Sequence, residues 1–306
     1  MNTTTATSDP YGSGKLWRVA IVGHPALAGC AVVLLALLPV FGVAFLIDER
    51  TVLGTSVWVK PAKFAIALAL YTITLSWYVN YLPATWRQSR WFNRYVDVVV
   101  LTIVLEMLWL IGASSIGEAS HFNQTHPILA PVYFFMGVLA TILTSLSLLI
   151  GIGILNAGGS TLHGSNQHPT SHQTIATANN LIVRYAMAFG LILTFLLTLP
   201  TAGYLSSAPA QTHAVLPVGV SVAADSATLP ILGWLRGAGD LRVAHFFATH
   251  ALHAVPIIAL ALTLLVPSLR AVSRASARGI SLTISVAYSM LVGLVFLQAL
   301  SGRAFL

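Results

Sequence analysis

Seven long apolar stretches constrain this chain more than any other feature of its sequence. They cover residues 20–47, 64–82, 96–117, 128–155, 181–205, 243–266 and 280–300. A helix needs about 20 residues to cross about 30 Å of hydrocarbon, and each stretch reaches or approaches that length. In lipid the backbone must satisfy its own hydrogen bonds, which favours helices. We therefore expect an all-α, polytopic transmembrane helix bundle of about seven spans.

The composition agrees with a membrane protein and excludes several soluble classes. Of the 306 residues, 57% are hydrophobic and 8% are charged, whereas soluble domains carry about 25% charged residues. Disordered chains and nucleic-acid-binding domains need far more charge, so the expected partner is the lipid bilayer and no nucleic acid. Cys30 is the only cysteine, which excludes a disulfide within the chain and a thiolate zinc site.

The basic residues predict the orientation of the bundle. With the N-terminus inside, the inner side receives Lys15, Arg18, Arg87, Arg90, Arg94, Arg184, Arg270, Arg274 and Arg278. The outer side then receives only Arg50, Lys60, Lys63, Arg236, Arg242 and Arg303. Short basic loops resist translocation, so we predict the N-terminus inside and the C-terminus outside.

The spans form one transmembrane domain over residues 20–300. A polar cytoplasmic tail is expected at residues 1–19 and a short C-terminal tail at residues 301–306. The polar segment 159–180 is typical of a flexible connector. No internal repeat is found in the sequence, and this weakens an inverted-repeat transporter interpretation.

Ionisable side chains inside spans are the strongest functional signal. They are Glu106, His245, His250 and His253. Each costs about 2.5–3.5 kcal/mol at the bilayer centre on insertion scales and therefore needs a reason. On one continuous helix, the three histidines share a face of about 140° with Arg242 and Thr249. The pattern predicts a polar interior.

Helix geometry places Glu106, His250 and His253 at a similar depth, roughly 12–16 Å from the outer ends of their helices. Burial disfavours the charged form of a carboxyl and of an imidazole alike, which brings their proton affinities closer together. Glu106 with His250 or His253 could therefore relay protons in a proton-coupled small-solute transporter. The alternative is a buried hydrogen bond that only joins two helices.

A second polar layer is expected at the outer mouth. The candidate metal ligands there are His121, His126, His245, Glu118 and Asp240. A b-type haem would take His121 and His245 as axial ligands, and its propionates would need cations. The cofactor-binding cations on that side are Arg242, Lys60 and Lys63. A zinc hydrolase is a weaker alternative, because the chain lacks HExxH.

Three segments resemble uncharacterised bacterial multi-pass inner-membrane proteins: VWVKPAKFAIALALY, SSIGEASHFN and GDLRVAHFFATHALH. The matching residues are Lys60, Pro61, Lys63, Phe64, Ser120, His121, Phe122, Asn123, Asp240, Leu241, Arg242, Ala244 and His245. The resemblance implies a bacterial inner (plasma) membrane location but no activity. It favours the outer layer, because the pattern does not include His253.

Three classes of function remain open. The leading hypothesis is an outer-facing site for b-type haem or a transition metal, with a redox partner or small-molecule ligand. The second is the proton-coupled transporter, and the third is a structural or interaction protein of the membrane. Rhodopsin does not fit, because the last span lacks a lysine for a retinal Schiff base. Whether the protein is an enzyme is left open by the sequence.

Overall fold

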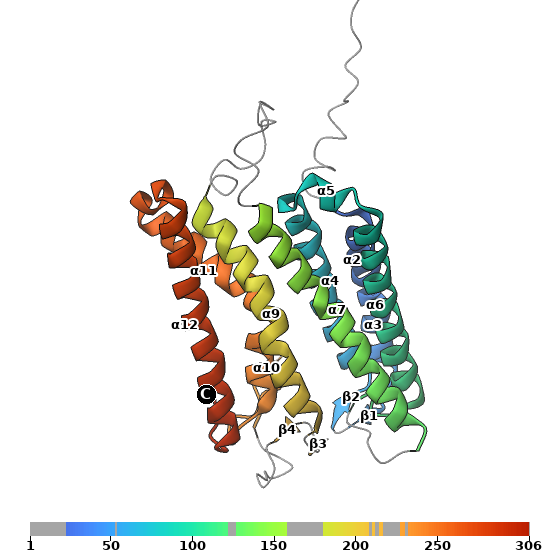
Figure 1. Ribbon diagram of the computed structural model, residues 1–306. Helices are drawn as coiled ribbons and strands as arrows, with labels where there is room; N and C mark the ends of the chain where they lie inside the picture. Colours follow the sequence, from blue (N-terminus) through green and yellow to red (C-terminus); the bar gives the residue numbers. More distant parts are fainter. Residues whose placement is uncertain are drawn as a thin grey trace, which may run out of the picture.

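The computed structural model describes residues 23–52, 54–121, 127–157, 180–207, 210–211, 214–216, 227–229 and 232–305. Within these ranges the chain is an all-α bundle with two short hairpins (Figure 1). Its helices are α2 (Pro25–Ala36), α3 (Leu38–Ile47), α4 (Val59–Tyr78), α5 (Ala84–Arg87), α6 (Arg90–Ile116), α7 (Leu129–Ala157), α9 (Leu181–Ser207), α10 (Leu241–Thr249), α11 (Ala251–Leu265) and α12 (Arg274–Leu300). The 3-10 turns are η1 (Val79–Tyr81) and η2 (Pro267–Ala271). The antiparallel hairpins join β1 (Thr51–Val52) to β2 (Thr55–Ser56) and β3 (Ala210–Gln211) to β4 (Ala214–Val215).

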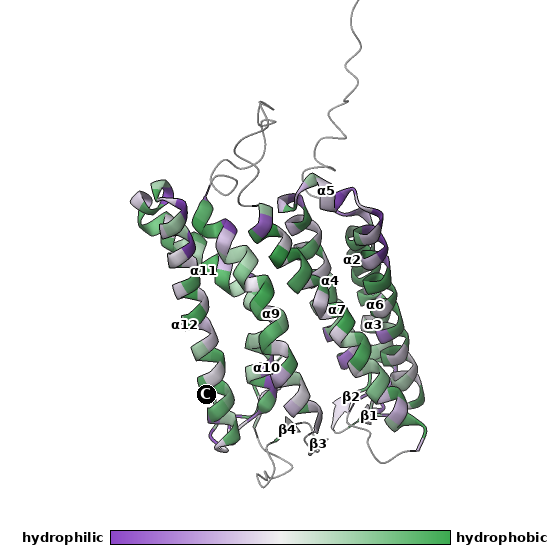
Figure 2. Ribbon diagram, viewed as in Figure 1, coloured by the Kyte–Doolittle hydropathy of each residue, from purple (hydrophilic) through white to green (hydrophobic). Residues whose placement is uncertain are grey.

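Six spans of the described chain are long and apolar enough to cross a membrane, and the bent pair α10–α11 makes a seventh. The chain is therefore an integral, multi-pass membrane protein, as the apolar stretches predicted. Large apolar side chains such as Leu46, Leu265 and Leu294 are exposed on its surface, which suits contact with lipid. Figure 2 shows hydrophobic residues along the helices and hydrophilic ones mainly near their ends, with α10 as an exception.

Several helices begin earlier than the apolar stretches predicted, because capping side chains extend them into polar sequence. Ser89 Oγ accepts a hydrogen bond from the Phe92 N–H, so α6 begins at Arg90. Ser273 does the same at the start of α12, which begins at Arg274. Such caps satisfy backbone donors that the first helical turn leaves unpaired.

The helices form two groups. One group contains α2, α3, α4, α6 and α7, and the other contains α9, α10, α11 and α12. The two groups meet where α7 packs along α9 (Figure 1). This seam is close, since a Cβ atom at Gly151 of α7 would lie 2.8 Å from the Ala188 carbonyl oxygen of α9. We call the end of the bundle that carries β1, β2 and the start of α10 the hairpin end; the charge distribution predicts that it faces outside.

The expectation of one continuous helix over residues 243–266 is wrong. The chain leaves the helix at His250, and α10 and α11 are bent by 63°. Thr249 Oγ1 donates to the Phe246 carbonyl oxygen at 2.9 Å, and His250 Nδ1 lies 2.7 Å from the same oxygen. These side chains compete with the backbone ladder. Pro256 in α11 also lacks the N–H that would bond the carbonyl four residues earlier.

Candidate polar site at a broken span

Side chains of three other helices satisfy the backbone at the break. Tyr78 of α4 donates its hydroxyl to the Leu252 carbonyl oxygen at 3.0 Å, the group that Pro256 leaves without a helical donor. Tyr288 of α12 donates to the Phe247 carbonyl oxygen at 2.7 Å. The Leu252 N–H donates to Thr194 Oγ1 of α9 at 2.8 Å. An unsatisfied backbone group in lipid costs several kcal/mol, so the break depends on these neighbours.

A glycine lets α9 approach the break. A Cβ atom at Gly190 would lie 2.7 Å from the Ala251 carbonyl oxygen and 3.3 Å from Pro256 Cδ. Thr194, which bonds Leu252, lies one turn further along the same helix. The close contact therefore allows Thr194 to reach the first turn of α11.

Two histidines lie at the break. His253 Nε2 lies 2.9 Å from Thr74 Oγ1 of α4, which joins the two helix groups. Its Nδ1 is buried and has no hydrogen-bond partner within the described structure. The His250 ring stacks on Phe246, with centroids 4.0 Å apart, and lies 5.8 Å from the His253 ring. Because of the bend, His245 lies on a differently directed helix from His253 and does not share one straight face with it.

Glu106 is buried in α6, with 5% of its surface exposed. Its Oε1 accepts no hydrogen bond from any described residue. Its charge interacts with that of Lys60, near the start of α4. The described hydrogen bonds of His250 and His253 involve Thr74, Thr249 and Phe246 instead. The structure thus brings Glu106 towards Lys60, an acid–base pair that the sequence analysis placed in separate layers.

His121 follows α6 at the hairpin end. Its Nδ1 lies 3.1 Å from Ser120 Oγ, and its ring lies between Phe64 and Tyr133, at centroid distances of 5.5 and 5.7 Å. Burial and the positive charge of Lys60 hold the pKa of His121 well below its ordinary value. The imidazole is therefore neutral at pH 7, the form in which histidine binds a metal.

Asp240, Arg242 and His245 start α10. Asp240 Oδ1 accepts a hydrogen bond from the Arg242 N–H and caps the helix, and the two side chains form an ion pair. Arg242 Nη2 also donates to the Gly233 carbonyl oxygen at 2.7 Å. His245 Nδ1 lies 3.4 Å from Thr201 Oγ1 of α9. Asp240 thus serves as a cap and an ion-pair partner here.

The predicted metal ligands are only partly brought together. His121 contacts α4 and α7 in one helix group, whereas His245 contacts α9 in the other. Glu118 is exposed. The described ranges contain no group of three or more His, Cys, Asp or Glu side chains that could hold a metal ion. His126 lies outside the described residues, and the haem or metal hypothesis stays a prediction.

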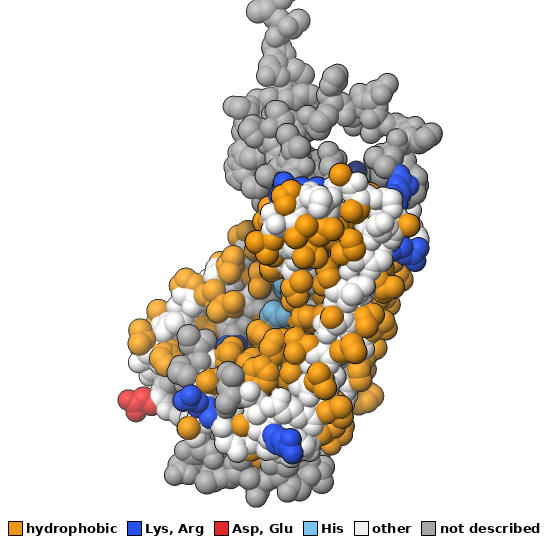
Figure 3. Space-filling model, turned by 90° about the vertical axis from the view of Figure 1, so that its left-hand side faces the viewer, with side chains coloured by type: hydrophobic (Ala, Val, Ile, Leu, Met, Phe, Trp, Pro, Cys, Tyr) orange, Lys and Arg blue, Asp and Glu red, His pale blue; other side chains and the backbone are white. Residues whose placement is uncertain are grey.

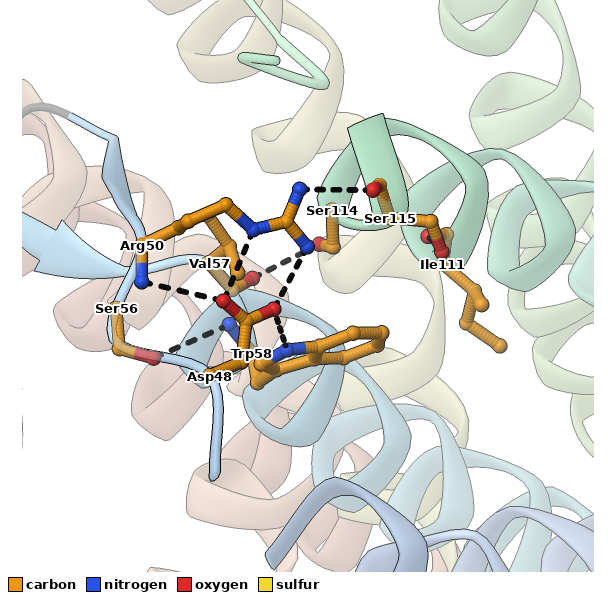
Figure 4. Close-up of polar contacts among 8 residues, drawn as sticks. All are labelled: Asp48, Arg50, Ser56, Val57, Trp58, Ile111, Ser114 and Ser115. Carbon is orange, nitrogen blue, oxygen red and sulfur yellow. Dashed lines mark hydrogen bonds and ion pairs between the residues drawn. The ribbon is translucent and has the colours of Figure 1, made fainter. Parts of the chain in front are cut away.

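The hairpin between α3 and α4 is fixed by a polar network that the sequence analysis missed (Figure 4). Arg50 Nε and Trp58 Nε1 donate to the Asp48 carboxylate at 2.9 and 2.8 Å. Arg50 Nη1 reaches α6 and donates to the Ser115 carbonyl oxygen at 2.9 Å. The hydrogen bonds from Arg50 and Trp58 lower the pKa of Asp48. We call Asp48, Arg50 and Trp58 the hairpin anchor.

One face of α4 reaches the second helix group only near the end of the helix, since Tyr71 on the same face donates to the Leu143 carbonyl oxygen of α7. At about 100° per residue, the members of this face lie within about 80° of one another. They are Lys60, Phe64, Ala67, Tyr71, Thr74 and Tyr78. Thr74 and Tyr78 contact α11, whereas Ala67, nearer the hairpin end, is exposed. Seen from the α12 side, the surface is hollowed near mid-height and a histidine side chain is visible in the hollow (Figure 3).

Comparison of the chain with protein-family models, with curated proteins and with solved structures gives no match.

Proposed function

We propose that the protein is a proton-coupled transporter of a small solute, with a pathway between the two helix groups that ends at the break between α10 and α11. The break carries the proposal. Irregular backbone at membrane depth is tolerated where it is buried in protein or lines a water-filled cavity. In many transporters, broken spans of this kind form the substrate and ion sites. From the resemblance noted above we expect a bacterial inner membrane location.

Contacts between α4 and α11 would close this pathway on the side away from the hairpin end. They are the hydrogen bond between Thr74 and His253 and the one that Tyr78 donates to the Leu252 carbonyl oxygen. Hydrogen bonds between helices in membranes contribute about 0.6–2 kcal/mol each, so two of them can separate reversibly. Towards the hairpin end Ala67 on the same face is exposed, which suits an opening on that side.

Glu106 is the proposed proton carrier. It is buried, its Oε1 accepts no hydrogen bond from the part of the chain that the structure describes, and its charge interacts with that of Lys60. A proton on Glu106 would remove its attraction for Lys60, so the loading of a proton would alter the force between α4 and α6. Intramembrane carboxylates commonly serve such relays. His253, whose Nδ1 has no hydrogen-bond partner among the described residues, is a second group that could exchange the proton.

Purified protein in liposomes that contain pyranine provides the test. A panel of amino acids, monocarboxylates and sugars would be added outside while the lumenal pH is recorded. We expect one class of solute to acidify the lumen with wild-type protein. Glu106→Gln should lose this acidification yet keep exchange of labelled solute, whereas Glu118→Gln, which alters an exposed carboxylate, should behave as wild type. Equal solute-driven acidification by Glu106→Gln and wild type would refute the role of Glu106.

A haem or transition-metal site at His121 and His245 is the second candidate. The positions of Lys60 beside His121 and of Lys63 beside Arg242 favour it, because haem propionates need cations. An absorption spectrum before and after dithionite, with elemental analysis of the same sample, tests it. A bound cofactor that is lost in both His121→Ala and His245→Ala would support the site; retention in both variants would contradict it.

A further inference from the structure

An apolar groove runs between α3 and the first two turns of α4, on a different face from the proposed pathway. It has a volume of about 250 Å³. Phe41 forms its floor and stacks on Trp58, with ring centroids 6.2 Å apart. Phe45 and Ile66 line it and are 51% and 53% exposed. The groove therefore opens towards the hydrocarbon that surrounds the bundle.

Two cations lie at the rim of this groove. Lys63 lines the groove, and its Nζ lies 3.9 Å from the position that a Cβ atom of Gly233 would take. The carbonyl oxygen of Gly233 accepts a hydrogen bond from Arg242. Lys63 and Arg242 are close enough for their like charges to interact. Arg242 already pairs with Asp240, so Lys63 is the cation at this rim that a further anion would chiefly neutralise.

We propose that the groove binds one acyl chain of an anionic phospholipid, whose phosphate lies beside Lys63 and Arg242. The apolar groove suits an acyl chain and offers a soluble ligand little to bond. Lysine and arginine are the usual partners of phosphate, and the rim lies at the hairpin end, where lipid headgroups are expected. The lipid site does not depend on transport. The residues whose contacts would close the pathway, Thr74, Tyr78 and His253, do not line the groove.

Native mass spectrometry of the detergent-purified protein tests the proposal, with phosphatidylglycerol and phosphatidylcholine of identical chains added in equal amounts. We expect wild-type protein to retain phosphatidylglycerol several-fold more than phosphatidylcholine. Lys63→Gln should reduce that ratio towards one. Gly42→Leu should lose the bound lipid, because Gly42 lines the groove and a side chain there meets nothing within 4 Å.

Gly29→Leu is the matched control. A Cβ atom at Gly29 also has open space, but this residue lies on α2 outside the groove. It should retain lipid as wild type does. Equal lipid retention by Gly42→Leu and Gly29→Leu, or equal retention of both lipids by wild type, would overturn the proposal. Glycerol 3-phosphate serves as the free-phosphate probe: if it raises the melting temperature as much as phosphatidylglycerol does, the site binds a soluble phosphate and the lipid assignment is wrong.

Discussion

Pro200 and Pro256 each lie inside a helix of the bundle, and only the span with Pro256 is sharply bent. α9 contains Pro200 and continues from Leu181 to Ser207. The span with Pro256 is interrupted at His250 and bent by 63°. Both prolines lack an N–H, so the loss of one helical hydrogen bond does not explain the difference.

The surroundings of the two prolines differ. Near Pro200, the hydroxyl of Thr201 bonds the Leu197 carbonyl oxygen within the same helix, at 2.8 Å. Near Pro256, the donors and acceptors come from other helices, and the side chains of Thr249 and His250 occupy the Phe246 carbonyl oxygen. The comparison teaches that a proline permits a break, while tertiary hydrogen bonds stabilise it.

Of the variants near the two prolines, Gly190→Ala is expected to lower the free energy of unfolding most. Its new Cβ atom would lie 2.7 Å from the Ala251 carbonyl oxygen, which forces α9 away from the break. Overpacking of this kind costs about 1–3 kcal/mol. Gly203→Ala, on the same helix with open space around the Cβ position, is the control. Unfolding by sodium dodecyl sulfate in mixed micelles measures both; equal stability of the two variants would show that the close contact is unimportant.

Loss of the tyrosine hydroxyls that α4 and α12 donate to the break is expected to have the next largest effect on stability. Tyr78→Phe removes the side-chain donor of the Leu252 carbonyl oxygen, and Tyr288→Phe leaves the Phe247 carbonyl oxygen with the His250 N–H at 3.3 Å; we expect each variant to cost about 0.5–2 kcal/mol. Thr201→Val, near Pro200, should cost less, because its hydroxyl donates within its own helix and its contact with His245 Nδ1, at 3.4 Å, is longer than those of the two tyrosines. The same unfolding assay applies. A larger loss for Thr201→Val than for either tyrosine variant would reverse the comparison.

A double-mutant cycle sharpens the role of the proline. Pro256→Ala supplies an N–H that competes with the Tyr78 hydroxyl for the Leu252 carbonyl oxygen. We therefore expect Tyr78→Phe to cost less in the Pro256→Ala background, with a coupling of about 0.5–1 kcal/mol. Pro200→Ala should show no coupling with Tyr78→Phe. Strict additivity in the Pro256 cycle would mean that Tyr78 does not replace a helical hydrogen bond that Pro256 removes from the Leu252 carbonyl oxygen.

The smallest effect on the break should come from the hairpin anchor. The pKa of Asp48 is lowered in the folded protein, so its contribution to stability is present above the unfolded pKa of about 3.9 and is lost as the pH falls through the folded pKa. The melting temperatures of wild type and Asp48→Asn should therefore differ by a constant amount between pH 7 and pH 5. The difference between the two melting temperatures should shrink only below about pH 4. The destabilisation by Asp48→Asn should add to that by Tyr78→Phe. A difference that shrinks between pH 7 and pH 5 would contradict the lowered pKa.

The spans could be predicted from the sequence because membrane insertion depends on the length and apolarity of each segment alone. The break could not, because its stability depends on Tyr78, Thr194 and Tyr288, whose proximity is a property of the packed bundle. Pro256 was a visible signal, since it marks the Leu252 carbonyl as lacking a helical donor. Depth estimates from helix length put Glu106 level with the histidines but could not show that Lys60 interacts with it.

Thiol labelling tests directly whether an aqueous path runs along α4 to the broken span. Cys30, the only cysteine, would be changed to Ser, and Ala67→Cys and Ile66→Cys would be made separately in that background. Both positions lie about 10–12 Å along α4 from its start and both are exposed, but Ile66 lines the lipid-facing groove, whereas Ala67 lies about 100° further round the helix, on the side that carries Thr74 and Tyr78. A charged, membrane-impermeant maleimide added outside intact cells should label Ala67→Cys and leave Ile66→Cys unmodified. Equal labelling of the two, or labelling of Ile66→Cys alone, would contradict the account.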